Sequence, residues 1–190
     1  MSLEHAPLPG AWYDLDVAMR ALTRDEIELI WTIDRSEVHH HIYKVVDGQL
    51  TLVPAYFEIP GWHPRMIEAD TPKLHECFDR GGVFLGSFDG DTLIGVSVVD
   101  TKPVGSAGEH VQLLYLYVSR AARGQGVGST LFAVAAEAAS ALGAEALYVS
   151  AVPTENTVNF YLRRGSSLAT PPDRDLLAAE PDDIHLTYPL

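Results

Sequence analysis

The chain of 190 residues has one cysteine, few basic residues and no long apolar run. Cys77 cannot form an internal disulfide, which agrees with a reducing compartment. No stretch approaches the roughly 18 consecutive apolar residues of a membrane helix. The first residues, with Glu4, Pro7 and Pro9, lack the apolar centre of a signal peptide. We therefore expect a cytoplasmic, globular protein with no membrane partner.

Positive charge is scarce, because 13 Lys and Arg residues face 26 Asp and Glu residues and give a formal net charge of −13. Such a chain repels a polyanion unless a basic patch overrides the net charge, and the sequence contains no basic run. We expect no nucleic-acid partner. An acidic surface favours a cationic small molecule or a basic polypeptide, although many acidic proteins are simply soluble.

The run His39, His40 and His41 is the one sequence feature that suggests a metal. Adjacent residues project in different directions, and neither a cysteine partner nor a spaced carboxylate–histidine set completes a site. We predict no metal site.

The apolar content of 47% is enough for one buried core, so we expect a single domain over residues 1–190. Thr23 and Glu26 fit a capping box at the start of a first helix. Asp47-Gly48 predicts a hairpin turn between strands at 42–46 and 50–53. Three prolines predict an irregular segment over 54–64.

Helix and strand patterns alternate through the rest of the chain. Thr71, followed by Pro72, predicts the start of a helix that ends at Gly81-Gly82. Helical spacing continues after the turn at 124–128 until Gly143, and a short helix is expected at 154–164. Strands are expected at 83–88, 92–100, 111–118, 146–152 and 184–188. On the strand at 111–118, strict alternation puts Leu114, Leu116 and Val118 on one face and Tyr115 and Tyr117 on the other.

The most informative segment is VSRAARGQGVGST at 118–130, a glycine-rich turn between a strand pattern and a helix pattern. Gly124, Gly126 and Gly128 let the backbone approach a bulky anion, and the first N–H groups of the following helix point at the same place. We interpret the turn as a phosphate-binding loop. The alternative is a loop whose glycines only permit a sharp turn.

Two sequence motifs in order carry a family resemblance. Arg123-Gly124-Gln125-Gly126-Val127-Gly128 reads R-x-x-G-x-G after a strand that ends at Leu116-Tyr117-Val118. The second motif is Pro153 to Tyr161, with Gly165 closing the helix. Together they resemble the GNAT superfamily of acetyl-CoA-dependent N-acetyltransferases. The resemblance covers 83–165 well, and WTIDRSE at 31–37 is similar to the first helix of some members.

The resemblance implies an α/β fold with a mixed, largely antiparallel central sheet flanked by helices on both faces. It implies an acceptor-side region at 1–70 and a cofactor-binding core at 83–165, with acetyl-CoA as the acetyl donor. Members often pair as homodimers. The residues implied in cofactor binding are Leu116, Tyr117, Val118, Arg123, Gly124, Gln125, Gly126, Val127, Gly128, Ser129, Asn156 and Tyr161.

The implied reaction moves the acetyl group to a primary amine of a small molecule or peptide in a ternary complex. The resemblance makes Tyr161 the proton donor to the leaving thiolate. The general base is open between Glu109, His110, Glu58 and a water, because the strand carries Gln112 where many members have a carboxylate. We keep Glu109 as the candidate catalytic residue beside Tyr161.

Other functions fit the residues less well. A dinucleotide motif would need a third glycine where Ser129 or Leu131 stands, and a phosphate-loop nucleotidase would need a lysine after Gly128. A non-catalytic acyl-CoA-binding sensor remains the alternative. Aromatic residues that fit either an acceptor pocket or the core are Trp12, Trp31, Trp62, Tyr56 and Phe57.

Overall fold

A computed structural model describes residues 17–105 and 107–190. The strands are β1 (Val17–Ala21), β2 (Glu37–Val46), β3 (Gln49–Ile59), β4 (Val83–Asp89), β5 (Thr92–Val104), β6 (His110–Val118), β7 (Ala146–Ala151), β8 (Ser167–Leu168) and β9 (Ile184–Pro189). The helices are α1 (Pro64–Asp79), α2 (Val127–Ala141), α3 (Glu155–Leu162), α4 (Arg174–Ala179) and two 3₁₀ helices, η1 (Arg24–Thr32) and η2 (Arg120–Ala122). Within the described ranges, every helix is too short or too polar to cross a membrane.

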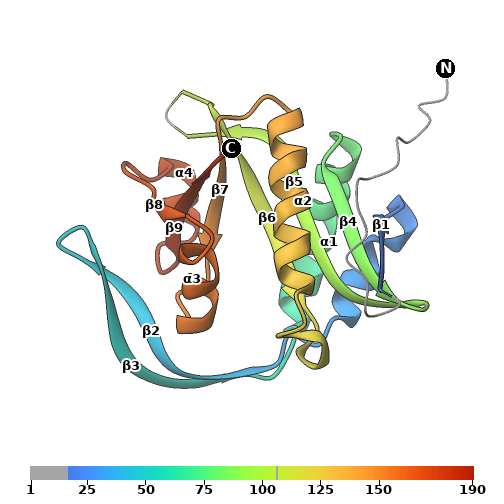
Figure 1. Cartoon of the computed structure of the whole chain (residues 1–190), viewed down its shortest axis with the longest axis horizontal. Coiled ribbons are helices and arrows are strands. Elements are labelled where there is room, and N and C mark those ends of the chain that lie inside the picture. Colours follow the sequence, from blue (N-terminus) through green and yellow to red (C-terminus); the bar gives the residue numbers. More distant parts are fainter. Residues whose placement is uncertain (1–16, 106) are drawn as a thin grey trace.

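A central sheet of seven strands organises the described chain in the order β1-β4-β5-β6-β7-β9-β8. Only the β6–β7 pair is parallel within this sheet, and its other neighbours are antiparallel. The predicted mixed, largely antiparallel sheet is therefore confirmed (Figure 1).

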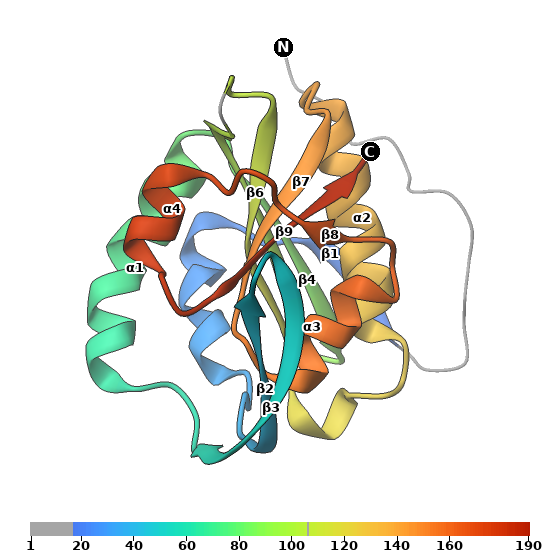
Figure 2. The ribbon, with the colours of Figure 1, turned by 90° about the vertical axis from the view of Figure 1, so that its left-hand side faces the viewer.

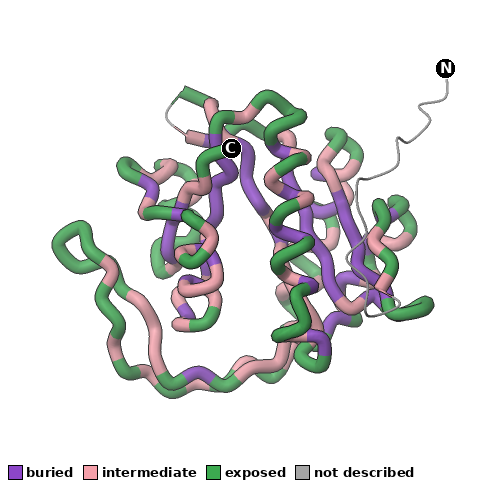
Figure 3. The backbone as a smooth tube through the Cα atoms, viewed as in Figure 1, coloured by how far each residue is buried: buried purple, intermediate pink, exposed green. Residues whose placement is uncertain are grey.

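Helices cover both faces of this sheet. On one face, α2 and α3 pack through Phe132, Val158 and Tyr161 onto the middle of the sheet. On the other face, η1 and α1 pack through Ile27 and Leu74. The burial pattern follows these layers, with the buried backbone concentrated along the central strands (Figure 3). The expected capping box forms at the start of η1, where Thr23 N donates to the Glu26 carboxylate at 2.9 Å.

The strands β2 and β3 form a separate two-stranded ribbon that curves away from the sheet (Figures 1 and 2). Its turn is the predicted one, with Asp47 and Gly48 at φ 50° and 76°. The prediction of an irregular segment from residue 54 was wrong, because β3 continues to Ile59. Pro54 is tolerated because β3, among the described residues, pairs with β2 alone and has a free outer edge, where a missing N–H costs no ladder bond.

The helix α1 begins seven residues earlier than the sequence predicts. Its N-cap is His63, whose Nδ1 accepts from Arg65 N at 3.2 Å, with Pro64 in the first turn. Thr71-Pro72, interpreted as the helix start, lies inside the helix. Thr71 Oγ1 donates to the carbonyl of Ile67 at 2.7 Å, a side-chain bond to the preceding turn. The Thr71-Pro72 pair therefore does not start a helix, and Pro72 is a proline tolerated in the helix interior.

Strand β6 departs from regular pairing on both sides. Towards β5, the register passes from Val98 opposite Tyr115 to Val99 opposite Leu113, so Leu114 is an extra, bulged residue. Leu114 consequently packs with Tyr115 and Tyr117 on the η1–α1 face, and the expected grouping of Leu114 with Leu116 and Val118 was wrong.

Towards β7, the pairing of β6 lasts only from His110–Ala146 to Gln112–Tyr148. Beyond this point the two strands separate, and β7 continues its pairing with β9. The separation leaves one backbone edge of β6 available next to the glycine turn. An extended ligand could add to this edge as a further strand does.

Cys77 lies on the inner side of α1 and is fully buried against the sheet. Burial and, to a smaller extent, the neighbouring Asp100 carboxylate raise the pKa of its thiol to about 12. The thiol is therefore neutral and inaccessible in the folded chain.

Candidate active site

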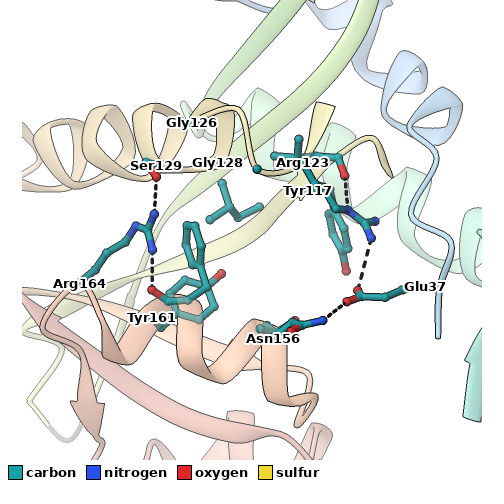
Figure 4. Close-up of a pocket in the computed structure, with 14 residues that line it drawn as sticks. Glu37, Tyr117, Arg123, Gly126, Gly128, Ser129, Asn156, Tyr161 and Arg164 are labelled. Atoms are coloured by element: carbon teal, nitrogen blue, oxygen red, sulfur yellow. Dashed lines mark hydrogen bonds and ion pairs between the residues drawn. The ribbon is translucent and has the colours of Figure 1, made fainter. Parts of the chain in front are cut away.

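A pocket of about 480 Å³ opens where β6 and β7 separate. Its walls come from β6, the glycine turn with the start of α2, helix α3, and the first residue of β2 (Figure 4). The lining residues are Glu37, Leu116, Tyr117, Val118, Arg123, Gly124, Gly126, Gly128, Ser129, Asn156, Thr157, Phe160, Tyr161 and Arg164. Its volume lies within the ~300–1,000 Å³ of ligand sites.

Most of the predicted cofactor-binding residues meet in this one pocket. Two of them do not line it. Gln125 turns back on its own loop and donates to the carbonyl of Ala121 at 2.9 Å. Val127 is buried against Leu131 in the core beneath α2. The side chains of both residues thus point away from the pocket, whereas their backbone N–H groups belong to the glycine turn.

The glycine turn has the geometry of an anion-binding loop. Gly124 and Gly126 have φ of 78° and 88°, the left-handed region that side chains with a Cβ avoid. Gly126 is the N-cap of α2, so the first N–H groups of α2 have no partner inside the helix and point outwards at its positive end. A phosphate group at this place would receive those N–H groups without a competing side chain.

The two arginines of the pocket differ in what they already bind. Arg123 holds the segment before β2, because its guanidinium donates to the carbonyls of Val118 (3.0 Å), Ser36 (3.2 Å) and Asp34 (3.4 Å). Arg164 instead reaches across the pocket to the Ser129 hydroxyl and lies 3.5 Å from the Phe160 ring centre.

Sequence reasoning assigned the positive charge to Arg123 and missed Arg164. The spacing could have revealed Arg164, which lies three residues after Tyr161, in the turn that follows α3. Desolvation lowers the pKa of Arg164, partly offset by Tyr161, and the guanidinium remains charged.

Tyr161 is brought into the pocket by α3, and 5% of its surface is exposed. Burial raises the pKa of its phenol, Tyr117 raises it further, and the charge of Arg164 opposes the shift. The hydroxyl is therefore protonated throughout the neutral range and can donate.

Glu37, which sequence reasoning missed, closes the pocket between Asn156 and Arg123 (Figure 4). Asn156 Nδ2 donates to Glu37 Oε1 at 2.7 Å, and Arg123 Nη1 is 3.5 Å from Glu37 Oε2. These contacts span 119 residues of sequence in one case and 86 in the other. No local motif signals a contact of this kind.

The structure does not bring the other candidate bases together with the pocket. Glu109 and His110 lie at the opposite end of β6, and Glu109 is seven residues, or about 23 Å of extended strand, from Leu116. Glu109 accepts from Ala107 N at 2.7 Å. Glu58 lies on β3, where it accepts from the Tyr56 hydroxyl. Gln112 is buried within β6.

The predicted aromatic residues take different places. Trp31 and Trp62 contact each other with ring centres 4.9 Å apart, and Trp62 contacts Tyr117 at 4.8 Å. Of this cluster, only Tyr117 lines the pocket, and the two tryptophans pack behind it on the η1–α1 face of the sheet. Tyr56 is exposed on the ribbon, and Phe57 stacks on His39 at 4.8 Å. Trp12 lies outside the described residues.

The described ranges contain no group of three or more His, Cys, Asp or Glu side chains arranged to hold a metal ion. Of the histidine run, His39 is buried, while His41 pairs with Glu155 at 3.1 Å on the surface.

A strand that parts from its neighbour beside a helix-capping glycine turn defines a site for an extended, phosphate-bearing ligand. The sequence profile of the acetyltransferase (GNAT) family matches residues 49–165, more than half of the chain. The chain belongs to this family, and it is an acetyltransferase. It has no match among curated protein sequences.

Solved structures share the fold over nearly the whole chain. A nourseothricin acetyltransferase is 21% identical, with a TM-score of 0.68 over 91% of this chain and 98% of that one. A protein described as a streptothricin acetyltransferase of Bacillus anthracis, in complex with acetyl coenzyme A, is 13% identical, with a TM-score of 0.62 over 93% and 98%. The PaiA N-acetyltransferase of Thermoplasma acidophilum, in complex with coenzyme A, is 16% identical, with a TM-score of 0.60 over 93% and 100%.

Proposed function

We propose that the protein transfers the acetyl group of acetyl-CoA directly to a primary amine in a ternary complex. The observation that carries this proposal is the single pocket that joins the glycine turn, the unpaired edge of β6 and Tyr161. These three features match the pyrophosphate, the extended arm and the thioester end of the donor in that order.

The donor's diphosphate would bind the N–H groups at the start of α2, where Arg164 adds a positive charge. Its arm would pair with the backbone of Leu116 to Val118, and Asn156 would meet its amides from α3. The thioester would then lie beside the Tyr161 hydroxyl. As the acetyl group leaves, this phenol donates its proton to the thiolate.

Arg164→Gln is expected to weaken acetyl-CoA binding about 10-fold to 150-fold, because a charge-assisted hydrogen bond to phosphate is worth roughly 1.5–3 kcal/mol. The Kd is measured by calorimetry at low and high salt, and the loss should shrink at high salt. Equal Kd values for the variant and the wild type would remove Arg164 from the donor site.

The acceptor is tested with a panel of amines. Two proteins of similar fold are named for acetylating nourseothricin and streptothricin, so the panel contains these two compounds, 1,4-diaminobutane and a peptide with a free N-terminus. The net charge of −13 supports a cationic acceptor.

The measurement is thiol release together with the mass of the product. Release with at least one amine is expected. Tight acetyl-CoA binding without release for any amine would instead support the acyl-CoA sensor.

A further inference from the structure

The proposed reaction needs a group that removes a proton from the amine, since alkyl amines are largely protonated at neutral pH. Glu109, Glu58 and His110 lie outside the pocket lining. Within the described part of the chain, Glu37 is the single carboxylate among the residues that line the pocket.

We propose that Glu37 is the general base for the acceptor amine and that His39, behind it, is the positioning residue that takes up the proton from Glu37. This inference rests on the proposed function and names the residue that function lacks.

The position of Glu37 is fixed from three sides. It begins β2, and the carbonyls of Ser36 and Asp34 just before it are held by Arg123. Its Oε1 accepts from Asn156 on α3 at 2.7 Å. The carboxylate is thus held at the junction of the donor slot and the acceptor-side ribbon, within one pocket with Tyr161 (Figure 4).

His39 lies behind this carboxylate because residues two apart on a strand share a face. Its ring is 3% exposed and packs on Phe57 from β3. Its Nε2 is buried, has no hydrogen-bond partner among the residues that the structure describes, and is 3.7 Å from Glu37 Oε2. A buried, unsatisfied ring nitrogen is costly. Once Glu37 carries a proton, a short movement towards it would let Nε2 accept a hydrogen bond from the carboxyl group.

Burial lowers the pKa of His39, the carboxylate of Glu37 opposes the shift, and the charges of Arg123 and His40 add to it. The ring is therefore neutral at pH 7 and able to accept a proton from a protonated Glu37.

The step balances as follows in atoms and charge. The ammonium gives one proton to Glu37, and the nitrogen lone pair attacks the thioester carbonyl carbon. The C–N bond forms, the C–S bond breaks, and sulfur takes the phenolic proton of Tyr161. The second proton that leaves nitrogen restores the phenol through water. The proton on Glu37 is taken up by His39 Nε2 and later returns through the partly exposed Glu37 carboxylate to solvent, because Nε2 itself is buried. The products are the acetamide, free coenzyme A and one proton.

The test compares Glu37→Gln with a matched control. Glutamine keeps an oxygen for Asn156 but cannot accept a proton. Glu155→Gln removes the other carboxylate that pairs with a histidine of β2, at His41, and Glu155 does not line the pocket. Thiol release is followed from pH 6 to 10 with ethylamine and with 2,2,2-trifluoroethylamine, a less basic amine of similar size. The best amine of the panel is tested in parallel.

Glu37→Gln should lower kcat for the panel amine at pH 7.5 about 100-fold or more, the range of a lost general base. Its Kd for acetyl-CoA should change less than threefold. The defect should shrink as pH rises and with trifluoroethylamine, because an amine that is already neutral needs no base. His39→Gln should lower kcat about fivefold to tenfold and change the acidic limb of the pH profile. Glu155→Gln should match the wild type.

Full activity of Glu37→Gln at pH 7.5 would overturn the inference, and so would a loss that is equal at every pH and for both small amines. In either case the proposed function stands, because the wild type still releases thiol. If the wild type binds acetyl-CoA but releases no thiol with any amine, the proposed function fails and this inference fails with it.

Discussion

The proposed cofactor side of the pocket and the proposed acceptor side next to it are built in different ways. The cofactor side comes from one continuous stretch, β6 through α3, in which each element begins or ends at a local signal such as Gly126 or Gly165. The acceptor side joins η1, the ribbon and α1 through contacts between distant residues, such as Trp31 Nε1 to Thr71 Oγ1. The cofactor side can therefore be recognised from the sequence, whereas the acceptor side becomes visible only when the fold brings its distant residues together.

The largest expected effect tests the cofactor side through Gly126→Val. The residue has φ 88°, so valine is strained by about 1–2 kcal/mol, and its side chain occupies the anion-binding loop. We expect acetyl-CoA binding to weaken beyond detection in calorimetry.

Gly143→Val is the matched control, because Gly143 has φ 81° and open surroundings but lies after α2, outside the pocket. Both variants should lose similar stability, and only Gly126→Val should lose the donor. Normal acetyl-CoA binding by Gly126→Val would refute the loop assignment.

Tyr161→Phe tests whether the cofactor side contributes to turnover separately from acetyl-CoA binding. Removing the hydroxyl should lower kcat about 100-fold, within the usual range of a lost general acid, while the Kd of acetyl-CoA changes little. Steady-state kinetics and calorimetry measure the two quantities. A parallel loss in both would reassign Tyr161 to packing against Phe132, its ring neighbour at 5.8 Å.

Trp62→Phe tests the acceptor side. The indole Nε1 donates to the Ile33 carbonyl at 2.8 Å, and the ring contacts both Arg35 and Tyr117. Without the indole, the hydrogen bond to Ile33 is lost and Tyr117, which the ring contacts, is displaced. The KM for the amine should rise about threefold to tenfold, since one hydrogen bond is worth about 1 kcal/mol. The acetyl-CoA Kd should stay constant, and a change in it would contradict the division between the two sides.

The smallest expected effect concerns the half-buried Asp183, in the loop before β9. Burial and, to a smaller extent, the charge of Glu180 raise its pKa to about 6. Because the folded pKa exceeds the unfolded value near 3.9, the free energy of unfolding should fall as pH rises from about 4 to 6.

Asp183→Asn should remove this pH dependence and stabilise the chain above pH 6. The gain is about 1 kcal/mol once solvent screening is allowed for. Urea unfolding at pH 4 and pH 7 measures the effect. A variant that is less stable than the wild type at pH 7 would show that the ionised carboxylate has a favourable contact.

The same division explains what the sequence could predict. Features that depend on a few neighbouring residues were predicted, and the structure contains them. They are the glycine turn, the α3 motif, the Asp47-Gly48 hairpin and the capping box at Thr23. The start of α1 was missed because His63-Pro64 and Thr71-Pro72 give equivalent signals. The bulge at Leu114 depends on pairing with β5 and has no local cause.

The candidate site follows the same rule. Ten of its fourteen lining residues were predicted. Among the others, Glu37 could not be predicted, because only the docking of β2 on α3 brings it to Asn156. The role of Glu109 stays a prediction that no contact with the pocket supports.

The buried Cys77 has a practical consequence for every experiment on turnover. Coenzyme A is itself a thiol, and reagents that colour with thiols are the simplest detectors of its release. Because the protein's one sulfhydryl is shielded and protonated, such a reagent added to the folded enzyme reports product alone. Folded enzyme without substrate should therefore give no thiol signal. A slow rise of colour in that control would measure the fraction of unfolded protein, in which Cys77 is accessible.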